Sequence, residues 1–176
     1  FGAMAPWQVK NLEPVSMDAA FDSDTSPGVV STSWIQVARM GAYKGHAAGP
    51  FEFNDKVFGT IIQNFKRTRN GRVPVDYEHA TERMDGTIPR QGAPAVGWIV
   101  DLESRGEAGL WGKVEWIDPQ AVQYVRGGQY RYFSPAVIFE AVDRITGEGI
   151  GPELVSGGLT NRPFLDGMAP LTASAQ

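Results

Sequence analysis

The sequence predicts a mainly β fold of the α+β class: a compact antiparallel β-barrel of about six or seven strands with flanking helices. Three observations support this prediction. Glycine and proline are frequent, with 21 and 12 residues among 176, so turns are numerous. Aromatic residues reach 11%, which favours short strands over long helices. Only two segments have the signals of a helix start and stop. The remaining strands would expose unpaired edges in an open sheet, and closing them into a barrel would hide those edges.

The N-terminal third carries the first expected strands. Residues 29–40 are β-branched and partly alternating, which predicts a strand. Residues 41–50 are rich in turn formers and are expected to be a link. Phe51 and Phe53 then alternate with Glu52, which predicts a short second strand.

The clearest helix follows directly. Asn54 is a good N-cap, and Asp55 in the first turn suits the helix dipole. Asn70-Gly71 is a typical helix stop. The apolar residues between these signals recur at helical spacing: Val57, Phe58, Ile61, Ile62 and Phe65.

A short strand is predicted over residues 72–79, where Val73 and Val75 alternate with polar or proline positions. Pro74 has no N–H to give to a neighbour, so this strand is expected to lie at a sheet edge or to begin at that point. Residues 80–94 contain several glycines and prolines and are expected to form a long loop.

A hairpin and a second helix are predicted next. Residues 95–103 and 110–116 alternate as strands, and 105–109 has the composition of a tight turn. Asp118 as N-cap and Pro119 at the first helical position begin a short helix that ends near Arg126.

The C-terminal part returns to strands. Residues 129–142 predict a long strand that carries Ser134, and 143–151 is a glycine-rich turn. Residues 153–158 are expected to be a strand or turn, and 159–163 to be extended.

Domain organisation is expected to be simple. Residues 1–5 resemble a cloning scar, residues 6–171 form a single domain, and residues 172–176 form a flexible tail. Small residues dominate that tail.

Composition excludes several functions. A net charge of −4 gives no electrostatic basis for binding nucleic acid. No apolar run approaches the roughly 20 residues of a membrane span. With no cysteine there is no disulfide and no thiolate metal site, and no metal-ligand or cofactor motif is present.

Ser134 and His79 are the candidate catalytic residues. The chain has two histidines and no cysteine, so nucleophilic chemistry without a cofactor points to a serine and a histidine. Ser134 has apolar and aromatic neighbours that would shield it from water. His79 can accept the serine proton and later donate it. His46 lies in a flexible turn and is expected to be exposed.

The third catalytic residue stays open. Asp76 lies three residues before His79, which puts the two on opposite faces of a regular strand. Asp76 can therefore serve only if the chain bends at Tyr77-Glu78. Asn161 is an alternative, since an amide can also orient a histidine. The remaining candidates are Glu78, Glu140 and Asp143 as orienting groups, and Gly157-Gly158 and Arg162 as oxyanion stabilisers.

Five segments in this order resemble the bacteriophage Mu-type protease family, also called Mu-like prophage I proteins. They are Val73-Pro-Val-Asp-Tyr-Glu-His79, Gly97-Trp-Ile99, Gly109-Leu-Trp-Gly-Lys-Val-Glu-Trp116, Gly128-Gln-Tyr-Arg-Tyr-Phe-Ser-Pro135 and Leu159-Thr-Asn-Arg-Pro-Phe164. This family is similar to phage prohead proteases and, more distantly, to herpesvirus assemblins.

The resemblance implies a serine endopeptidase that processes scaffold and major capsid protein precursors, and itself, inside the assembling prohead in the bacterial cytoplasm. It implies no cofactor and allows a homo-oligomer, because assemblins need to dimerise. Assemblins use a second histidine after the serine, but this chain has none after His79. Asn161 and Arg162 lie in roughly the corresponding region.

Two other functions remain open. One is a scaffold or capsid-assembly module without catalytic activity, and the other is a β-barrel that only binds peptides.

Overall fold

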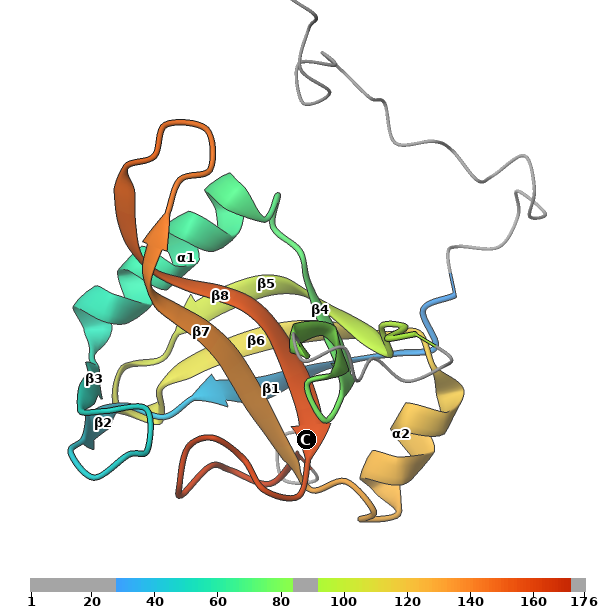
Figure 1. The fold of residues 1–176 in the computed structure, drawn as a ribbon. Helices are drawn as coiled ribbons and strands as arrows, with labels where there is room; N and C mark the ends of the chain where they lie inside the picture. The colour runs from blue at the N-terminus through green and yellow to red at the C-terminus, as the bar shows by residue number, and fades with distance from the viewer. Residues whose placement is uncertain (1–27, 84–91, 172–176) are drawn as a thin grey trace, which may run out of the picture.

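The computed structural model describes residues 28–83 and 92–171, in which a curled six-stranded sheet forms a half-barrel with two α-helices beside it (Figure 1). A separate two-stranded ribbon lies at one side. The elements in chain order are β1 (Ser31–Ala38), β2 (Gly41–Tyr43), β3 (Phe51–Phe53), α1 (Asp55–Thr68), β4 (Val73–Tyr77), the 3₁₀ turn η3 (Ala80–Glu82), β5 (Gly97–Ser104), the 3₁₀ turn η4 (Gly106–Ala108), β6 (Leu110–Trp116), α2 (Pro119–Arg126), β7 (Tyr132–Val142) and β8 (Gly149–Thr160).

The large sheet has the strand order β1-β6-β5-β4-β8-β7, and β2 pairs with β3. The mainly β fold class is confirmed. The expected all-antiparallel pairing is wrong at one place, because β4 and β8 run parallel. The long chain between them contains the β5–β6 hairpin and α2, which allows the parallel return.

Several local predictions are confirmed. The side chain of Asn54 accepts a hydrogen bond from the amide of Val57 and caps α1. Asp118 caps α2 in the same way, with Pro119 in its first turn. The β5–β6 hairpin also forms as expected.

Other local predictions need correction. The link over residues 41–50 contains β2, which exists because it pairs with β3, so the described chain has eight strands rather than six or seven. β8 is one continuous strand where a turn and two short segments were expected. β4 is an inner strand, not an edge, but Pro74 precedes the first residue paired with β8, Val75. Its missing N–H therefore interrupts no β4–β8 bond.

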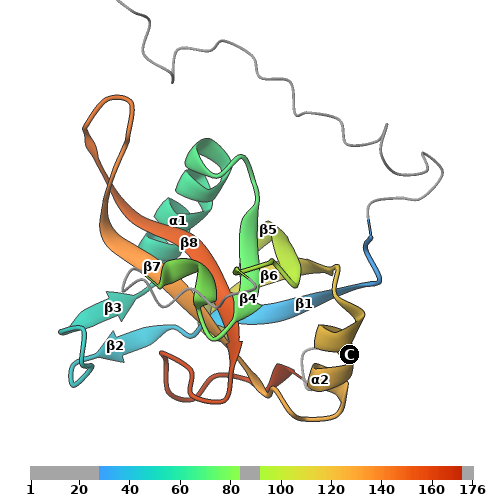
Figure 2. The same cartoon turned by 45° about the vertical axis from the view of Figure 1, so that its right-hand side comes forward.

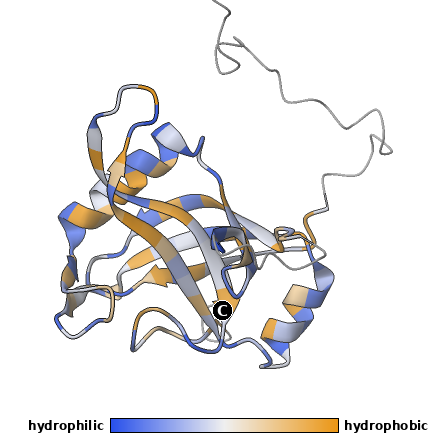
Figure 3. Cartoon of the chain, in the orientation of Figure 1, coloured by the Kyte–Doolittle hydropathy of each residue, from blue (hydrophilic) through white to orange (hydrophobic). Residues whose placement is uncertain are grey.

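The core lies between the concave face of the sheet and α1. Figure 3 shows both hydrophobic and hydrophilic positions along α1, and its apolar side presents the fully buried Phe58 and Phe65 to the core. Phe133 and Leu159 enter from β7 and β8. This packing fixes β8, the strand that separates the candidate site residues.

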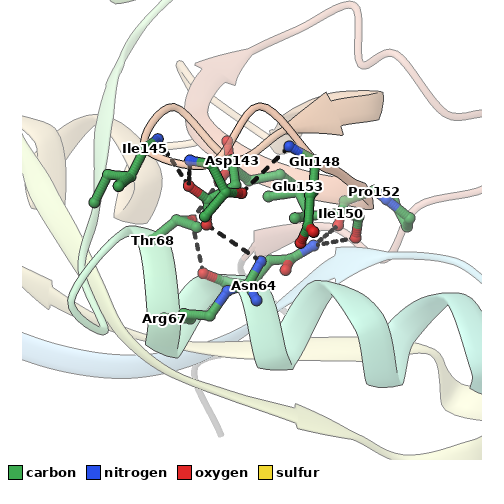
Figure 4. A network of polar contacts seen from close by, with 10 residues as sticks. Asn64, Arg67, Thr68, Asp143, Ile145, Glu148, Ile150, Pro152 and Glu153 are labelled. Atoms are coloured by element: carbon green, nitrogen blue, oxygen red, sulfur yellow. Dashed lines mark hydrogen bonds and ion pairs between the residues drawn. The ribbon is translucent and has the colours of Figure 1, made fainter.

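Polar contacts join α1 to the β7–β8 hairpin (Figure 4). The side-chain amide of buried Asn64 donates to the carbonyls of Ile150 and Pro152, both at 2.9 Å. Thr68 donates to the carboxylate of Glu153, and Arg69 binds the same carboxylate at 2.7 Å. These bonds fix the start of β8 against the helix.

Some expectations concern residues outside the described ranges. They are the scar at 1–5, part of the loop at 80–94, and the tail at 172–176. Among the described residues, no helix is both long and apolar enough to cross a membrane.

Candidate active site

Asp76 and Ser134 come together at Gly158. In the sheet, Asp76 of β4 and Ser134 of β7 both pair with Gly158 of β8, one from each side. Paired residues on neighbouring strands point to the same face of a sheet. Since Val75 and Phe133 point into the core, Asp76 and Ser134 point to the opposite face, called here the outer face.

His79 reaches the same place through a bend. Glu78 and His79 both adopt left-handed backbone conformations, with φ of 55° and 54°. Non-glycine residues are uncommon in this region. The amide of Glu78 still bonds to the carbonyl of Leu159, so the bend starts from a fixed strand end. The bend at Tyr77-Glu78 that Asp76 requires is therefore present.

Gly158 leaves the space that His79 occupies. A methyl group on Gly158 would lie 2.9 Å from the backbone nitrogen of His79 and 3.3 Å from its ring carbon Cγ. The same methyl would lie 3.3 Å from Oδ1 of Asp76. The imidazole and the carboxylate are therefore neighbours above a residue that has no side chain.

Asp76 is buried, with 1% of its surface exposed. Its Oδ2 accepts a 2.8 Å hydrogen bond from the amide of Thr81, so the carboxylate fixes the η3 turn that follows His79. Its Oδ1 is buried and has no hydrogen-bond partner. A buried acceptor without a donor is costly, so Oδ1 is available to an imidazole N–H.

Tyr77 fixes the strand end before the bend. Its ring stacks on Tyr130, with centroids 5.3 Å apart, and its hydroxyl donates to Asp118 at 3.2 Å. Burial first, and then the charge of Asp118 and its hydrogen bond with Tyr77, raise the pKa of Tyr77 far above its ordinary value. The phenol is therefore a neutral structural donor.

Ser134 is buried, with 1% of its surface exposed. Its Oγ accepts a 2.9 Å hydrogen bond from the backbone amide of Phe164. Both Ser134 and His79 belong to the described part of the chain, and no hydrogen bond joins their side chains there. The structure therefore shows a covered serine beside an unengaged histidine.

His46 corrects an expectation, because it is half-buried rather than exposed. Its Nδ1 accepts from the amide of Ala48, which leaves the proton on Nε2, and Nε2 donates to the carbonyl of Phe164 at 3.0 Å. The two rings also pack with centroids 4.1 Å apart. His46 therefore holds the residue whose backbone amide binds Ser134.

The other sequence candidates have different surroundings. Both polar atoms of the Asn161 amide bind backbone, Oδ1 accepting from Arg131 and Nδ2 donating to Gln129. The Arg162 side chain is exposed. Glu78 accepts a hydrogen bond from Thr160. The remaining positions are Glu140, exposed on β7, Asp143, in the β7–β8 turn, and Gly157, which faces the core under the Phe133 ring.

Ser156 was missed by reasoning from the sequence. It is fully buried on β8, and its Oγ has no hydrogen-bond partner. It pairs with Ala136, two residues along β7 from Ser134. Burial without a hydrogen-bond partner is the one feature that distinguishes Ser156 here, and no local sequence motif predicts that burial. Within the described ranges, no three histidine, aspartate or glutamate side chains gather as metal ligands.

Comparisons with known proteins concern the chain as a whole. The family model for the N-terminal domain of Mu-like prophage I proteins matches residues 35–172. Protease I of Escherichia phage Mu is 26% identical over 152 residues, which cover 81% of this chain and 40% of that protein. The chain thus spans about two fifths of the length of this curated relative. No solved structure matches the chain.

Proposed function

The chain belongs to the family of Mu-like prophage I proteins, and on that premise we propose that it is a serine endopeptidase. Its substrates are phage scaffold and capsid precursor proteins, and it also cleaves itself during prohead maturation. It acts in the host cytoplasm inside the assembling prohead. The name of its relative, Protease I, supports the proteolytic part of this proposal.

In the proposed reaction, Oγ of Ser134 attacks the carbonyl carbon of a peptide bond while His79 takes its proton. The tetrahedral intermediate then collapses, the C–N bond breaks, and His79 gives the proton to the leaving amine. Water next attacks the acyl ester with His79 again as base. The carboxyl product leaves, and Ser134 regains its proton.

Asp76 is the better candidate for the third residue. Its free Oδ1 lies beside the His79 ring, where it can orient the imidazole and stabilise its cation. Asn161 is less suited, because its amide already binds backbone through both polar atoms. The exposed guanidinium of Arg162 has no ion-pair partner among the described residues, so it remains the candidate oxyanion stabiliser.

One observation carries the proposal: the nucleophile, the base and the orienting carboxylate all adjoin Gly158. Two of them pair with it in the sheet, and the third occupies the space above it. Perturbed or unpaired polar groups that converge in this way are typical of functional sites.

The covered state of Ser134 favours a second candidate, a non-catalytic module that binds peptides or assists scaffold and capsid assembly. Its hydroxyl is inaccessible and accepts a bond from Phe164. In the enzyme hypothesis the same observation requires Phe164 to move before substrate reaches Ser134.

The test is processing of a co-expressed scaffold–capsid precursor by the wild type, Ser134→Ala and His79→Ala, with folding checked by circular dichroism. Each variant should lose activity by about 10³-fold or more while the fold persists. Labelling with a fluorophosphonate, followed by mass spectrometry, should modify Ser134 alone.

Ser156→Ala is the matched comparison, because it removes a second buried hydroxyl from the same face of the sheet. Processing lost in Ser156→Ala but retained in Ser134→Ala would move the nucleophile to Ser156. Processing retained in both variants would remove serine catalysis and leave the non-catalytic candidate.

A further inference from the structure

A hollow of about 390 Å³ lies on the outer face of β7 and β8, next to His79. His79, Glu82, Ala48 and Phe164 border it from segments outside β7 and β8. The rest of its lining is apolar and comes from β7 and from Val155 of β8. The hollow is called here the groove.

Val155 faces the groove because β8 contains a bulge. Ala136 pairs with Ser156, but the next residue, Val137, pairs with Leu154, so Val155 is an extra residue in β8. A bulge breaks the alternation of a strand and re-aims a side chain, often beside an active site. Leu154 keeps its place in the core, while Val155 lines the groove.

The groove also follows the edge of β7. Five consecutive residues, 135–139, line it, and consecutive residues of a strand alternate between faces, so the groove must reach along the strand edge. In the described ranges β7 pairs only with β8 and ends the sheet order. Figures 1 and 2 both show β7 as the last strand on this side of the sheet. Such an edge can accept an added strand.

We propose that the groove is the substrate subsite: an extended peptide lies along β7 and inserts an apolar side chain between Val155 and Ile138. This rests on the proposed function, since the catalytic base His79 is part of the groove's lining and a residue bound there lies near the scissile bond. Among the described residues of the lining, Glu82 alone carries a formal charge, so an acidic side chain would lose its hydration without gaining a cationic partner from them.

The test begins with the bonds that the wild type cleaves in the precursor. Short peptides spanning one such bond, with Ala, Val, Leu or Asp at each position in turn, give relative values of kcat/KM. One position next to the bond should favour Val or Leu over Asp by about tenfold or more. Equal rates for apolar and acidic residues at every position would overturn the proposal.

Variants locate the preference. Val155→Ala enlarges the groove and should shift the preference from Val toward Leu by about tenfold, since a pocket resolves single methylene groups at that level. Ile138→Ala, at a more exposed position of the same groove, should shift it in the same direction and covers the case in which Val155→Ala fails to fold. Val142→Ala, on β7 outside the groove, should change nothing.

Binding separates this proposal from the proposed function. Fluorescence anisotropy of labelled octapeptides, with Ala, Val, Leu or Asp at one position of an otherwise serine–glycine sequence, measures binding to Ser134→Ala and requires no known cleaved bond. Suppose that apolar peptides bind more tightly, that Val155→Ala changes this preference, and that the wild type cleaves nothing. This result would support the groove as a peptide-binding site and contradict the proposed protease activity. If the wild type cleaves but neither Val155→Ala nor Ile138→Ala changes its residue preference, the protease activity is supported and the groove is not the substrate subsite.

Discussion

The backbone N–H of Phe164 lies 2.9 Å from Oγ of Ser134 and donates a hydrogen bond to it. The carbonyl of the same residue accepts from His46, which belongs to the loop between β2 and β3. Phe164 therefore connects the candidate nucleophile to a histidine 88 positions earlier in the sequence. The two hydrogen bonds therefore link the β2–β3 loop to Ser134 through one residue.

His46→Ala should make Ser134 more reactive. The substitution removes the hydrogen bond to the Phe164 carbonyl and the contact between the two rings. One hydrogen bond contributes about 1 kcal/mol, so the fraction of molecules in which Phe164 has moved away from Ser134 should rise roughly fivefold. The rate of fluorophosphonate labelling of Ser134 should rise by that factor. Lys44→Ala, an exposed position in the same loop, is the control. A labelling rate that is unchanged or lower in a folded His46→Ala protein would show that His46 does not hold Phe164 against Ser134.

Gly158→Ala should abolish catalysis with a smaller effect on folding. The added methyl lies 2.9 Å from the His79 backbone and close to both the imidazole and the Asp76 carboxylate, so the bend must shift. Displacing a catalytic group by about 1 Å can cost on the order of 10²-fold in rate. Precursor processing and circular dichroism measure the two effects. Full activity would mean that His79 acts from another position.

Gly59→Ala is the glycine control for that experiment. Gly59 lies within α1, and a methyl added there meets nothing within 4 Å. Alanine is a better helix former than glycine, so the variant should be about 0.5–1 kcal/mol more stable. Activity should be unchanged. Lower stability here would indicate that glycine substitutions act nonspecifically in this protein.

The sequence predicts elements whose signals are local. Asn54 as a cap, apolar spacing through Phe65, and Asp118 before Pro119 each act within one or two turns, so α1 and α2 could be predicted. The β5–β6 hairpin is local for the same reason. β2 lacks such a signal, because its three residues become a strand only by pairing with β3.

The candidate site depends on distant pairings. Ser134 and Asp76 flank Gly158 because β4 runs parallel to β8, and residue patterns do not report which strands become neighbours. The bend at Glu78 and His79 also lacks a glycine, the usual signal for left-handed backbone. Chemistry could therefore suggest Ser134 and His79, while their meeting at Gly158 required the structure.

Gly157→Ala should destabilise the fold by about 1–3 kcal/mol or more through overpacking. Gly157 lies under the Phe133 ring, and an added methyl would lie 2.0 Å from its Cζ. Chemical denaturation measures the loss. Gly149→Ala, on the same strand with nothing within 4 Å, is the matched control.

Combining Gly157→Ala with Phe133→Leu tests the cause. The smaller side chain makes room for the methyl, so the double variant should be more stable than the sum of the two single losses predicts. Additive losses would place the strain of Gly157→Ala elsewhere in β8.

Acidification should weaken the attachment of α1 to β8 through Glu153. Burial alone would raise the pKa of Glu153, but hydrogen bonds from Arg69 and Thr68 and the charges of Arg69 and Arg144 outweigh it, so the pKa lies below its ordinary value of 4.5. A carboxyl with a lowered folded-state pKa stabilises the fold above its unfolded pKa. That stability is lost as the pH falls below 4.5 and through the folded value.

Glu153→Gln should therefore lower the free energy of unfolding at neutral pH by about 1–3 kcal/mol, because it leaves the half-buried side chain of Arg69 without a charged partner. The difference from wild type should shrink as the pH falls below 4.5, because Glu153 takes up a proton first in the unfolded chain and then, at its lower folded-state pKa, in the native protein. The pKa of Asp143 is also lowered, by N–H bonds from Thr146 and Ile145, so only the difference between the two proteins isolates Glu153. Urea unfolding at several pH values measures this difference in the free energy of unfolding, and Glu148→Gln, at an exposed position, is the control. A difference that is constant from pH 7 to about pH 3 would show that the carboxylate charge does not stabilise this contact.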